Sequence, residues 1–130
     1  GYGIKAGAVA LSIAHDSHNI IVVGVSDEEM EFAVNSLIAQ EGGMVLVKEG
    51  KVIESMPMPI AGLMSDQSGE WVDEKLTAIH AKAYEELGIA GDVEPVMTLC
   101  FMSLAVIPEV KLTDMGLFDV TTFSFIPVEA

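Results

Sequence analysis

Five consecutive polar side chains interrupt the apolar first part of this sequence, and they are its strongest candidates for chemistry. They are His15, Asp16, Ser17, His18 and Asn19. Two imidazoles three residues apart, with a carboxylate between them, could contact a substrate, act as acid and base near neutral pH, or ligate a metal ion. The same residues suit a plain turn in which Asp16 and Asn19 bond their own backbone. A His-x-x-His pair outside a helix is a weak metal signal, so catalysis or substrate contact ranks ahead of metal ligation. A purely structural turn remains an alternative.

The other chemically capable side chains fit structural roles better. His80 lies on the flank of a predicted helix, and Cys100 lies in an apolar run without a basic neighbour. We interpret His80 as a boundary residue and Cys100 as part of the core. Packing explains Met56, Met58 and Met64, and capping or turn formation explains Asp66, Asp114 and Asp119. Phosphate-binding loops, nucleophile elbows and paired Cys-x-x-Cys motifs are absent, so we assign no catalytic residue and no metal ligand in this chain.

The charge of the chain excludes several classes of partner. Its 130 residues carry 20 acidic side chains and 6 lysines, with no arginine, for a net charge of −14. Such a surface repels phosphate backbones and acidic lipids, so we expect neither nucleic acid nor a membrane as partner. Without arginine, a neutral or cationic small molecule fits better than an anion. A single cysteine excludes a disulfide scaffold, and we expect a cytoplasmic protein with a reduced thiol.

The elements that must position the polar pentad are predicted from apolar patterning. Residues 1–7 carry three glycines and no periodicity, and we interpret them as a lead-in or a linker. The apolar runs 8–14 and 20–25 predict strands on either side of the pentad. Ser26 followed by Glu29 predicts a reciprocal capping box at the start of a helix over 27–41.

The second half of the sequence continues the same alternation. Strands are predicted over 44–47 and 51–56, joined by a turn at Gly50, and a loop or an edge segment follows over 60–67. A second helix is predicted over 68–87, and a last strand over 118–128. The run 96–106 could be a strand or a buried helix, and the overall order counts it as a strand. The fold class predicted is a single compact α+β domain with a mainly antiparallel sheet covered by two or more helices.

Three stretches together resemble the C-terminal domain of bacterial adenine deaminase, of the amidohydrolase superfamily. They are Ala14-His-Asp-Ser-His-Asn-Ile20, Pro59-Ile-Ala-Gly-Leu-Met-Ser65 and Leu112-Thr-Asp-Met-Gly-Leu-Phe-Asp-Val120. The resemblance runs from about residue 3 to the C-terminus, with the three motifs in order. It implies a longer parent chain whose upstream barrel domain holds a divalent metal, manganese or iron, and hydrolyses adenine to hypoxanthine and ammonia. Residues 1–130 would then be an accessory domain, with 1–7 as its linker from that barrel.

The resemblance also implies what this domain contributes. The barrel would be its partner in the same chain, and a homo-oligomer is expected. The domain itself is expected to bind no cofactor and to be inactive alone, because it lacks the barrel's metal-binding His-x-His pair. The His15–Asn19 turn would face the mouth of the active site, and this domain would shape that mouth or hold subunits together. A non-catalytic binding or oligomerisation module is the alternative, and a small independent enzyme working through His15 and His18 ranks third.

Overall fold

A four-stranded antiparallel sheet forms the centre of the molecule. The computed structural model describes residues 1–129. Its main sheet has the order β2 (Ile21–Gly24), β1 (Ala8–Leu11), β3 (Gly43–Lys48) and β4 (Lys51–Pro57). The helices are α1 (Asp27–Ala39), α2 (Gly69–Glu85) and α3 (Pro95–Phe101). A second antiparallel sheet contains β5 (Val110–Thr113), β6 (Gly116–Asp119) and β7 (Ser124–Phe125). The predicted α+β class with a mainly antiparallel, helix-covered sheet is confirmed.

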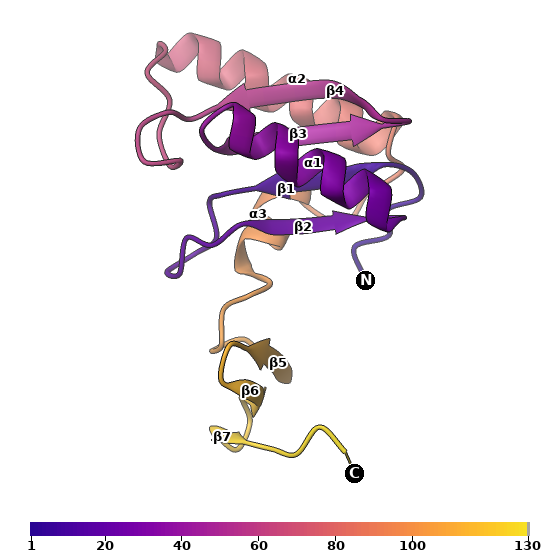
Figure 1. Cartoon of the computed structure of the whole chain (residues 1–130). Coiled ribbons are helices and arrows are strands. Elements are labelled where there is room, and N and C mark those ends of the chain that lie inside the picture. The colour runs from indigo at the N-terminus through magenta and orange to yellow at the C-terminus, as the bar shows by residue number, and fades with distance from the viewer. Residues whose placement is uncertain (130) are drawn as a thin grey trace.

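Alternation along β1 and β3 explains why helices cover both faces of the main sheet. Ala10 pairs with Val45, and both face α1, where Leu37 is fully buried. Leu11 pairs with Met44 on the other face, in the cluster that contains Ile79 of α2. Figure 1 shows α1 and α2 on opposite faces of this sheet, with α3 on the α2 side. Both faces of β1 and β3 are therefore buried, which is why these strands are apolar at nearly every position.

Local sequence signals set the ends of the predicted elements, with one exception. The Ser26 hydroxyl accepts a hydrogen bond from the Glu29 amide at 3.3 Å, so the N-cap is confirmed. The predicted return bond of a capping box is not made, because Glu29 Oε1 instead accepts from the Glu49 amide at 2.7 Å. Glu49 and Gly50 have φ of 53° and 67°, as a two-residue type I′ hairpin turn requires.

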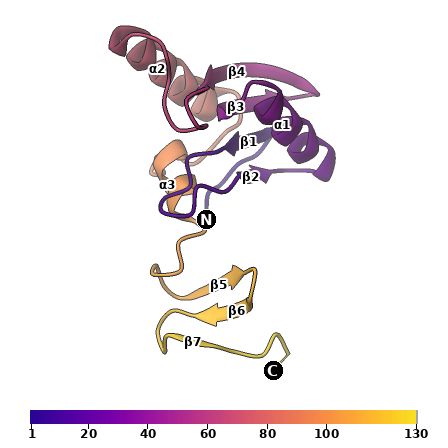
Figure 2. The same ribbon diagram turned by 60° about the vertical axis from the view of Figure 1, so that its left-hand side comes forward.

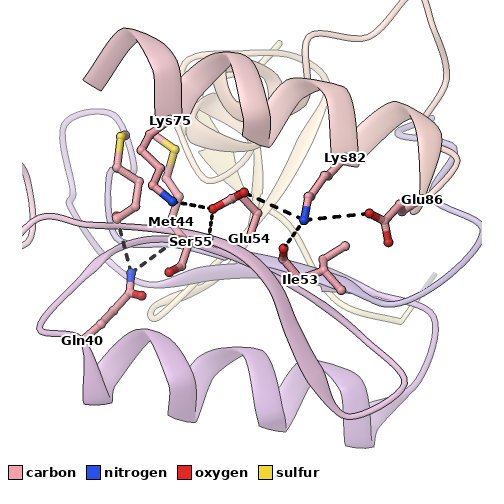
Figure 3. Close-up of polar contacts among 9 residues, drawn as sticks. Gln40, Met44, Ile53, Glu54, Ser55, Lys75, Lys82 and Glu86 are labelled. Atoms are coloured by element: carbon pink, nitrogen blue, oxygen red, sulfur yellow. Dashed lines mark hydrogen bonds and ion pairs between the residues drawn. The ribbon is translucent and has the colours of Figure 1, made fainter. Parts of the chain in front are cut away.

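A polar seam joins β4 to α2 at the side of the apolar core (Figure 3). Lys75 Nζ donates to Glu54 Oε1 at 2.8 Å, and Lys82 Nζ lies 3.9 Å from Glu54 Oε2. Burial raises the pKa of Glu54, but hydrogen bonds from Lys75 and the Ser55 amide, with the charges of both lysines, lower that pKa further, to a net value below the ordinary one. Lys82 also donates to the Ile53 carbonyl at 2.5 Å. The seam fixes α2 along the edge strand β4.

The first seven residues pack onto the same body. The Lys5 amide donates to the Leu87 carbonyl at 2.9 Å, and the Tyr2 hydroxyl donates to the Pro95 carbonyl at 2.7 Å. Burial, then the nearby Glu94 and Tyr84, raises the pKa of Tyr2 above its usual range. This packing joins the N-terminal segment to α2 and α3. Its role as a linker from an upstream domain stays a prediction.

The last third of the chain departs most from the predicted order of elements. The run 96–106, counted as a strand, forms helix α3 and then turns. Pro95 occupies the first turn of α3, where its missing N–H costs nothing, and Glu94 caps the helix by accepting from the Met97 amide. The single strand predicted over 118–128 is also wrong, because β6 and β7 share this region and β5 precedes them.

A C-terminal arm, residues 103–129, extends from the body. Figures 1 and 2 both show the sheet β5–β6–β7 apart from the main sheet and joined to it by the segment that follows α3. Within residues 1–129 the buried hydrophobic residues all lie between Ala8 and Leu99, so the body holds both core clusters and the arm adds none. Across the same residues, none of the helices has the length and apolarity that a bilayer crossing requires.

Candidate functional site

The polar pentad forms the connection from β1 to β2 at one end of the main sheet. All five side chains, His15 to Asn19, are exposed. The His18 amide donates to the Ala14 carbonyl at 2.9 Å, and the Ser17 amide donates to the His15 carbonyl at 2.9 Å. Asp16 and His18 adopt φ of 70° and 50°, a region that costs most residues energy but is less unusual for Asp and His. The backbone thus folds tightly and turns the polar side chains outward.

Helix α3 positions the first histidine of the pentad. The His15 amide donates to the Cys100 carbonyl at 2.8 Å, and the His15 ring stacks on Phe101 with 4.7 Å between centroids and 27° between planes. One ring face of His15 is therefore held by an aromatic side chain, while the residue as a whole stays exposed. Such a histidine can present its ring nitrogens outward in a fixed orientation.

Ser17 and Asn19 face a hollow shared with the arm. A concavity of about 370 Å³ is lined by Ser17, Asn19, Ser103, Leu112, Thr113 and Asp114. Asn19 Oδ1 accepts from Ser17 Oγ at 2.5 Å and from Ser103 Oγ at 3.4 Å. A smaller hollow of about 260 Å³ beside it is lined by Asp16, Ser17 and residues 103–106. The turn after β5 and the pentad, far apart in sequence, thus enclose one hydroxyl- and amide-rich surface.

The loop 59–65 lies at the same end of the main sheet. Antiparallel order places the end of β1, the start of β3 and the end of β4 together at this end. Ser12 ties them: its Oγ donates to the Gly62 carbonyl at 2.6 Å and accepts from the Gly43 amide at 2.8 Å. A bridge between Ile60 and Met64 closes the loop on itself. Three stretches that share no continuous element are thereby gathered at one end of the sheet.

His80 and Cys100 lie around a separate apolar hollow between α2 and α3. His80 Nε2 lies 2.7 Å from Glu94 Oε1, so the predicted boundary residue is an ion-pairing residue whenever its ring is protonated. Cys100 is half-buried, and the expectation that it belongs to the core is wrong. The hollow has about 330 Å³ and is otherwise lined by Ile13, Met44, Leu76, Val96 and Met97. Glu94 lines it as well, so its polar groups are His80, Glu94 and Cys100.

Metal chemistry finds no support in the arrangement of side chains. Among residues 1–129, histidine, cysteine, aspartate and glutamate nowhere gather in a group of three that could hold an ion. His15 and His18 belong to one turn, but no second carboxylate joins Asp16 there. Within residues 1–129, the pentad thus forms no such group with its neighbours.

Comparison with known proteins decides the family. The family model of the adenine deaminase C-terminal domain matches residues 1–124. The chain belongs to this family. It is 75% identical to adenine deaminase 2 of Desulfotalea psychrophila over 130 residues, which are all of this chain and 23% of that protein. It is 53% identical to adenine deaminase of Halalkalibacterium halodurans over 126 residues, 97% of this chain and 21% of that protein. With the adenine deaminase of Bacillus subtilis the identity is 47% over 129 residues, 99% of this chain and 22% of that protein.

These relatives extend well beyond the matched region. The adenine deaminase C-terminal domain described here spans about a fifth of the length of the relatives it matches. The resemblance seen in the sequence is thus confirmed, including its place within larger proteins.

Sequence reasoning found the pentad but missed the residues around it. Ser103 and Thr113 face the pentad across the hollow, and Ser12 fixes the neighbouring loop. The sequence indicates only a turn role for Asp114. In the structure Asp114 lies in the turn between β5 and β6 and also lines the hollow. The available signal was that all three motifs resemble the same family domain, since segments that are far apart in sequence can share one surface.

Proposed function

We propose that this chain is the accessory C-terminal domain of a longer adenine deaminase, and that its His15–Asn19 turn forms part of the mouth of an active site built by an upstream barrel domain. The observation that carries the proposal is the shared hollow of about 370 Å³ between the pentad and the turn after β5. It brings together two of the three stretches on which the family resemblance depends. A surface assembled from such distant stretches is better explained by a shared contact than by turn formation alone.

The chemistry of this surface suits a neutral purine. Hydroxyl, amide and carboxylate groups from Ser17, Asn19, Thr113 and Asp114 supply donors and acceptors that match the ring nitrogens and amino group of adenine. Anion-clamping arginines are not needed for such a ligand. The divalent metal, manganese or iron, and the water it activates would belong to the barrel, and this domain would supply contacts and exclude bulk water.

A histidine held on one face also fits this role. The stack on Phe101 and the backbone bond to Cys100 limit the directions in which the His15 ring can point. Preorganised polar groups contribute more to transition-state binding than mobile ones, because less freedom is lost in the complex. We therefore assign His15 a strong effect on the reaction. Asp16, which lines the smaller hollow next to it, is assigned a comparable effect, and the smaller flanking groups weaker ones.

The test measures adenine deamination by the longer parent chain. His15→Ala and Asp16→Ala are each expected to lower kcat/KM by at least tenfold, which is about 1.4 kcal/mol of transition-state stabilisation. Asp73→Ala, at an exposed aspartate on α2, is the matched control and is expected to leave kcat/KM unchanged. The 130-residue chain alone is expected to release no ammonia from adenine, with or without added manganese, iron or zinc.

Two results would contradict this function. Unchanged kcat/KM in both pentad variants would return the turn to a purely structural role and favour the binding or oligomerisation module. Metal-dependent ammonia release by the 130-residue chain would instead make it an enzyme in its own right. Thermal unfolding of the 130-residue variants separates a folding defect from lost activity. Each change is expected to cost about 1 kcal/mol of stability, because His15 loses its stack on Phe101 and an alanine at position 16 must keep φ near 70°.

A further inference from the structure

Exposed hydrophobic side chains are concentrated on the arm and the adjoining helix α3. Within residues 1–129 more than half of the large exposed hydrophobic residues lie between Met97 and Val128. Leu112 and Val128 are 80% exposed, Met115 is 76% exposed and Phe123 is 71% exposed, and no large hydrophobic residue of the body is exposed as much. We call the set Met97, Met102, Leu112, Met115, Phe123 and Val128 the arm face. A concentration of this kind marks an interaction surface, whereas scattered exposed hydrophobic residues do not.

Helices α1 and α2 of the body are rich in acidic residues. The first turn of α1 carries Asp27, Glu28 and Glu29, and α2 carries four acidic residues along its length. Of the 20 acidic residues in the chain, four belong to the arm, a share close to the arm's share of the length. The acidic helices suit water, and the arm face does not. Figure 2 shows the arm on the far side of α3 from these two helices, so the arm face lies apart from the acidic helices.

Besides its backbone ladder, the arm holds a small aromatic cluster. Phe118 contacts Phe123 at 5.2 Å and Phe125 at 5.3 Å between ring centroids, both edge to face. Phe118, Phe123 and Phe125 also line an apolar hollow of about 280 Å³ with Val106, Met115 and residues 113–114. A second hollow, of about 370 Å³, lies beside α3 at Met97, Phe101, Met102 and Ile107. A three-stranded sheet normally gains its stability by burying one face, and here that face stays open within residues 1–129.

We infer that the arm face is the surface against which the upstream domain of the same longer polypeptide packs. The inference rests on the proposed function, since it takes its partner from there. The choice of occupant follows from the relatives, which carry roughly four-fifths of their length outside a region that the family model describes as C-terminal. An occupant in the same chain is present at high effective concentration, so a moderate apolar interface is enough to hold it.

The position of the arm connects this interface to the active-site mouth. The turn after β5 lies on the arm and lines the same hollow as Ser17 and Asn19. Packing the arm face against an upstream domain therefore brings the pentad to that domain as well. The arm binds the upstream domain, and the pentad is thereby placed where it can contact the substrate.

Hydrogen–deuterium exchange tests this inference without relying on catalysis. Amide exchange in β5 and β6 is compared between the 130-residue chain and the parent chain. We expect exchange at least tenfold slower in the parent chain over residues 110–119, and equal exchange in α1, whose outer side stays in water. Leu112→Ser is expected to restore fast exchange of the arm in the parent chain, and to leave the unfolding temperature of the 130-residue chain unchanged because Leu112 is 80% exposed.

The control and the contrary outcomes are specific. Ile38→Ser removes a hydrophobic side chain that is 58% exposed on α1, and it is expected to leave exchange in the arm of the parent chain unchanged. Equal arm exchange in the two chains would overturn the inference. Slow exchange that appears in the 130-residue chain as its concentration rises, with a dimer in sedimentation, would assign the arm face to a second copy instead.

The two proposals can fail separately. Protection of the arm together with full activity of the His15→Ala parent chain would refute the active-site role and keep the interface. Loss of activity in His15→Ala together with an unprotected arm would refute the interface and keep the active-site role.

Discussion

Ser12 joins three segments at the site end of the sheet, and removing its hydroxyl is the most direct test of that arrangement. In Ser12→Ala the Gly62 carbonyl loses a donor at 2.6 Å and the Gly43 amide loses an acceptor at 2.8 Å. A Cβ placed on Gly42 would lie 2.6 Å from Gly62 Cα and 2.9 Å from Ser12 Oγ, which shows how closely the segments approach. Little room remains for water to replace the hydroxyl.

The expected cost follows from those two bonds. Each contributes about 1 kcal/mol net, and each leaves a partly buried backbone group unpaired when it is lost. The sum is about 2 kcal/mol. For a chain of this length the unfolding entropy is about 270 cal/mol/K, so the unfolding temperature should fall by about 7 °C. Urea unfolding followed by circular dichroism gives the free energy directly.

Ser17→Ala provides the matched control for this experiment. Ser17 Oγ donates to Asn19 within the exposed turn, so the same substitution should change the unfolding free energy by less than about 0.5 kcal/mol. Amide exchange of Leu63 and Met64, which bond back to Ile60, should speed up in Ser12→Ala and not in Ser17→Ala. A change below about 0.5 kcal/mol in Ser12→Ala would show that the three segments are held by packing alone, and the reasoning would be refuted.

Two further predictions concern backbone geometry and pH. Gly43→Ala should destabilise the chain by about 4 kcal/mol in urea unfolding, because φ is +105° and the new Cβ would lie 2.0 Å from the Met56 carbonyl oxygen. Gly50→Ala is the control: φ is +67° and the space around it is open, so it should cost about 1 kcal/mol. Equal costs of the two substitutions would contradict this reasoning. Glu54 has a pKa lowered below its ordinary 4.5, so its stabilisation is complete above that pH and is lost as the pH falls toward the folded value. Glu54→Gln should therefore flatten the acid side of the stability curve, measured as unfolding temperature from pH 3 to 7, while the exposed Glu74→Gln should not; parallel curves for wild type and Glu54→Gln would refute it.

The sequence predicts the body better than the arm because buried elements have a recognisable pattern of apolar residues, whereas exposed elements do not. The strands around Ala10 and Val45 have partners on both faces and are apolar throughout, and the cap at Ser26 is a local hydrogen bond. Helix α3 carried a usable signal in Glu94 and Pro95, which sit where a cap and a first-turn proline belong. The all-apolar run that follows obscured it, since such a run has no period to measure.

Sequence patterns did not predict, for a different reason, that the pentad and the turn after β5 meet at one hollow. β5 and β6 have partly exposed positions at every step, so their alternation is weak until a partner covers them. The meeting of Asn19 with Thr113 and Asp114 depends on the path of residues 102–109, which contain neither helix nor strand. A pattern within a segment cannot fix how two distant turns meet. The family resemblance placed these stretches in one domain, but it did not predict that they meet.

The last prediction tests whether α3 orients the candidate site. Phe101→Ala removes the ring that stacks on His15 at 4.7 Å between centroids. The ring current of Phe101 shifts the His15 imidazole proton signals in nuclear magnetic resonance spectra, so these signals should move toward random-coil positions in the variant. His18, which is exposed and lies three residues after His15, serves as the internal control and should keep its signals. The backbone bond from His15 to Cys100 remains available, so the turn should stay folded while the ring becomes mobile. Unchanged His15 signals would mean that the stack does not persist in solution, and that the orientation of the imidazole must come from the turn itself.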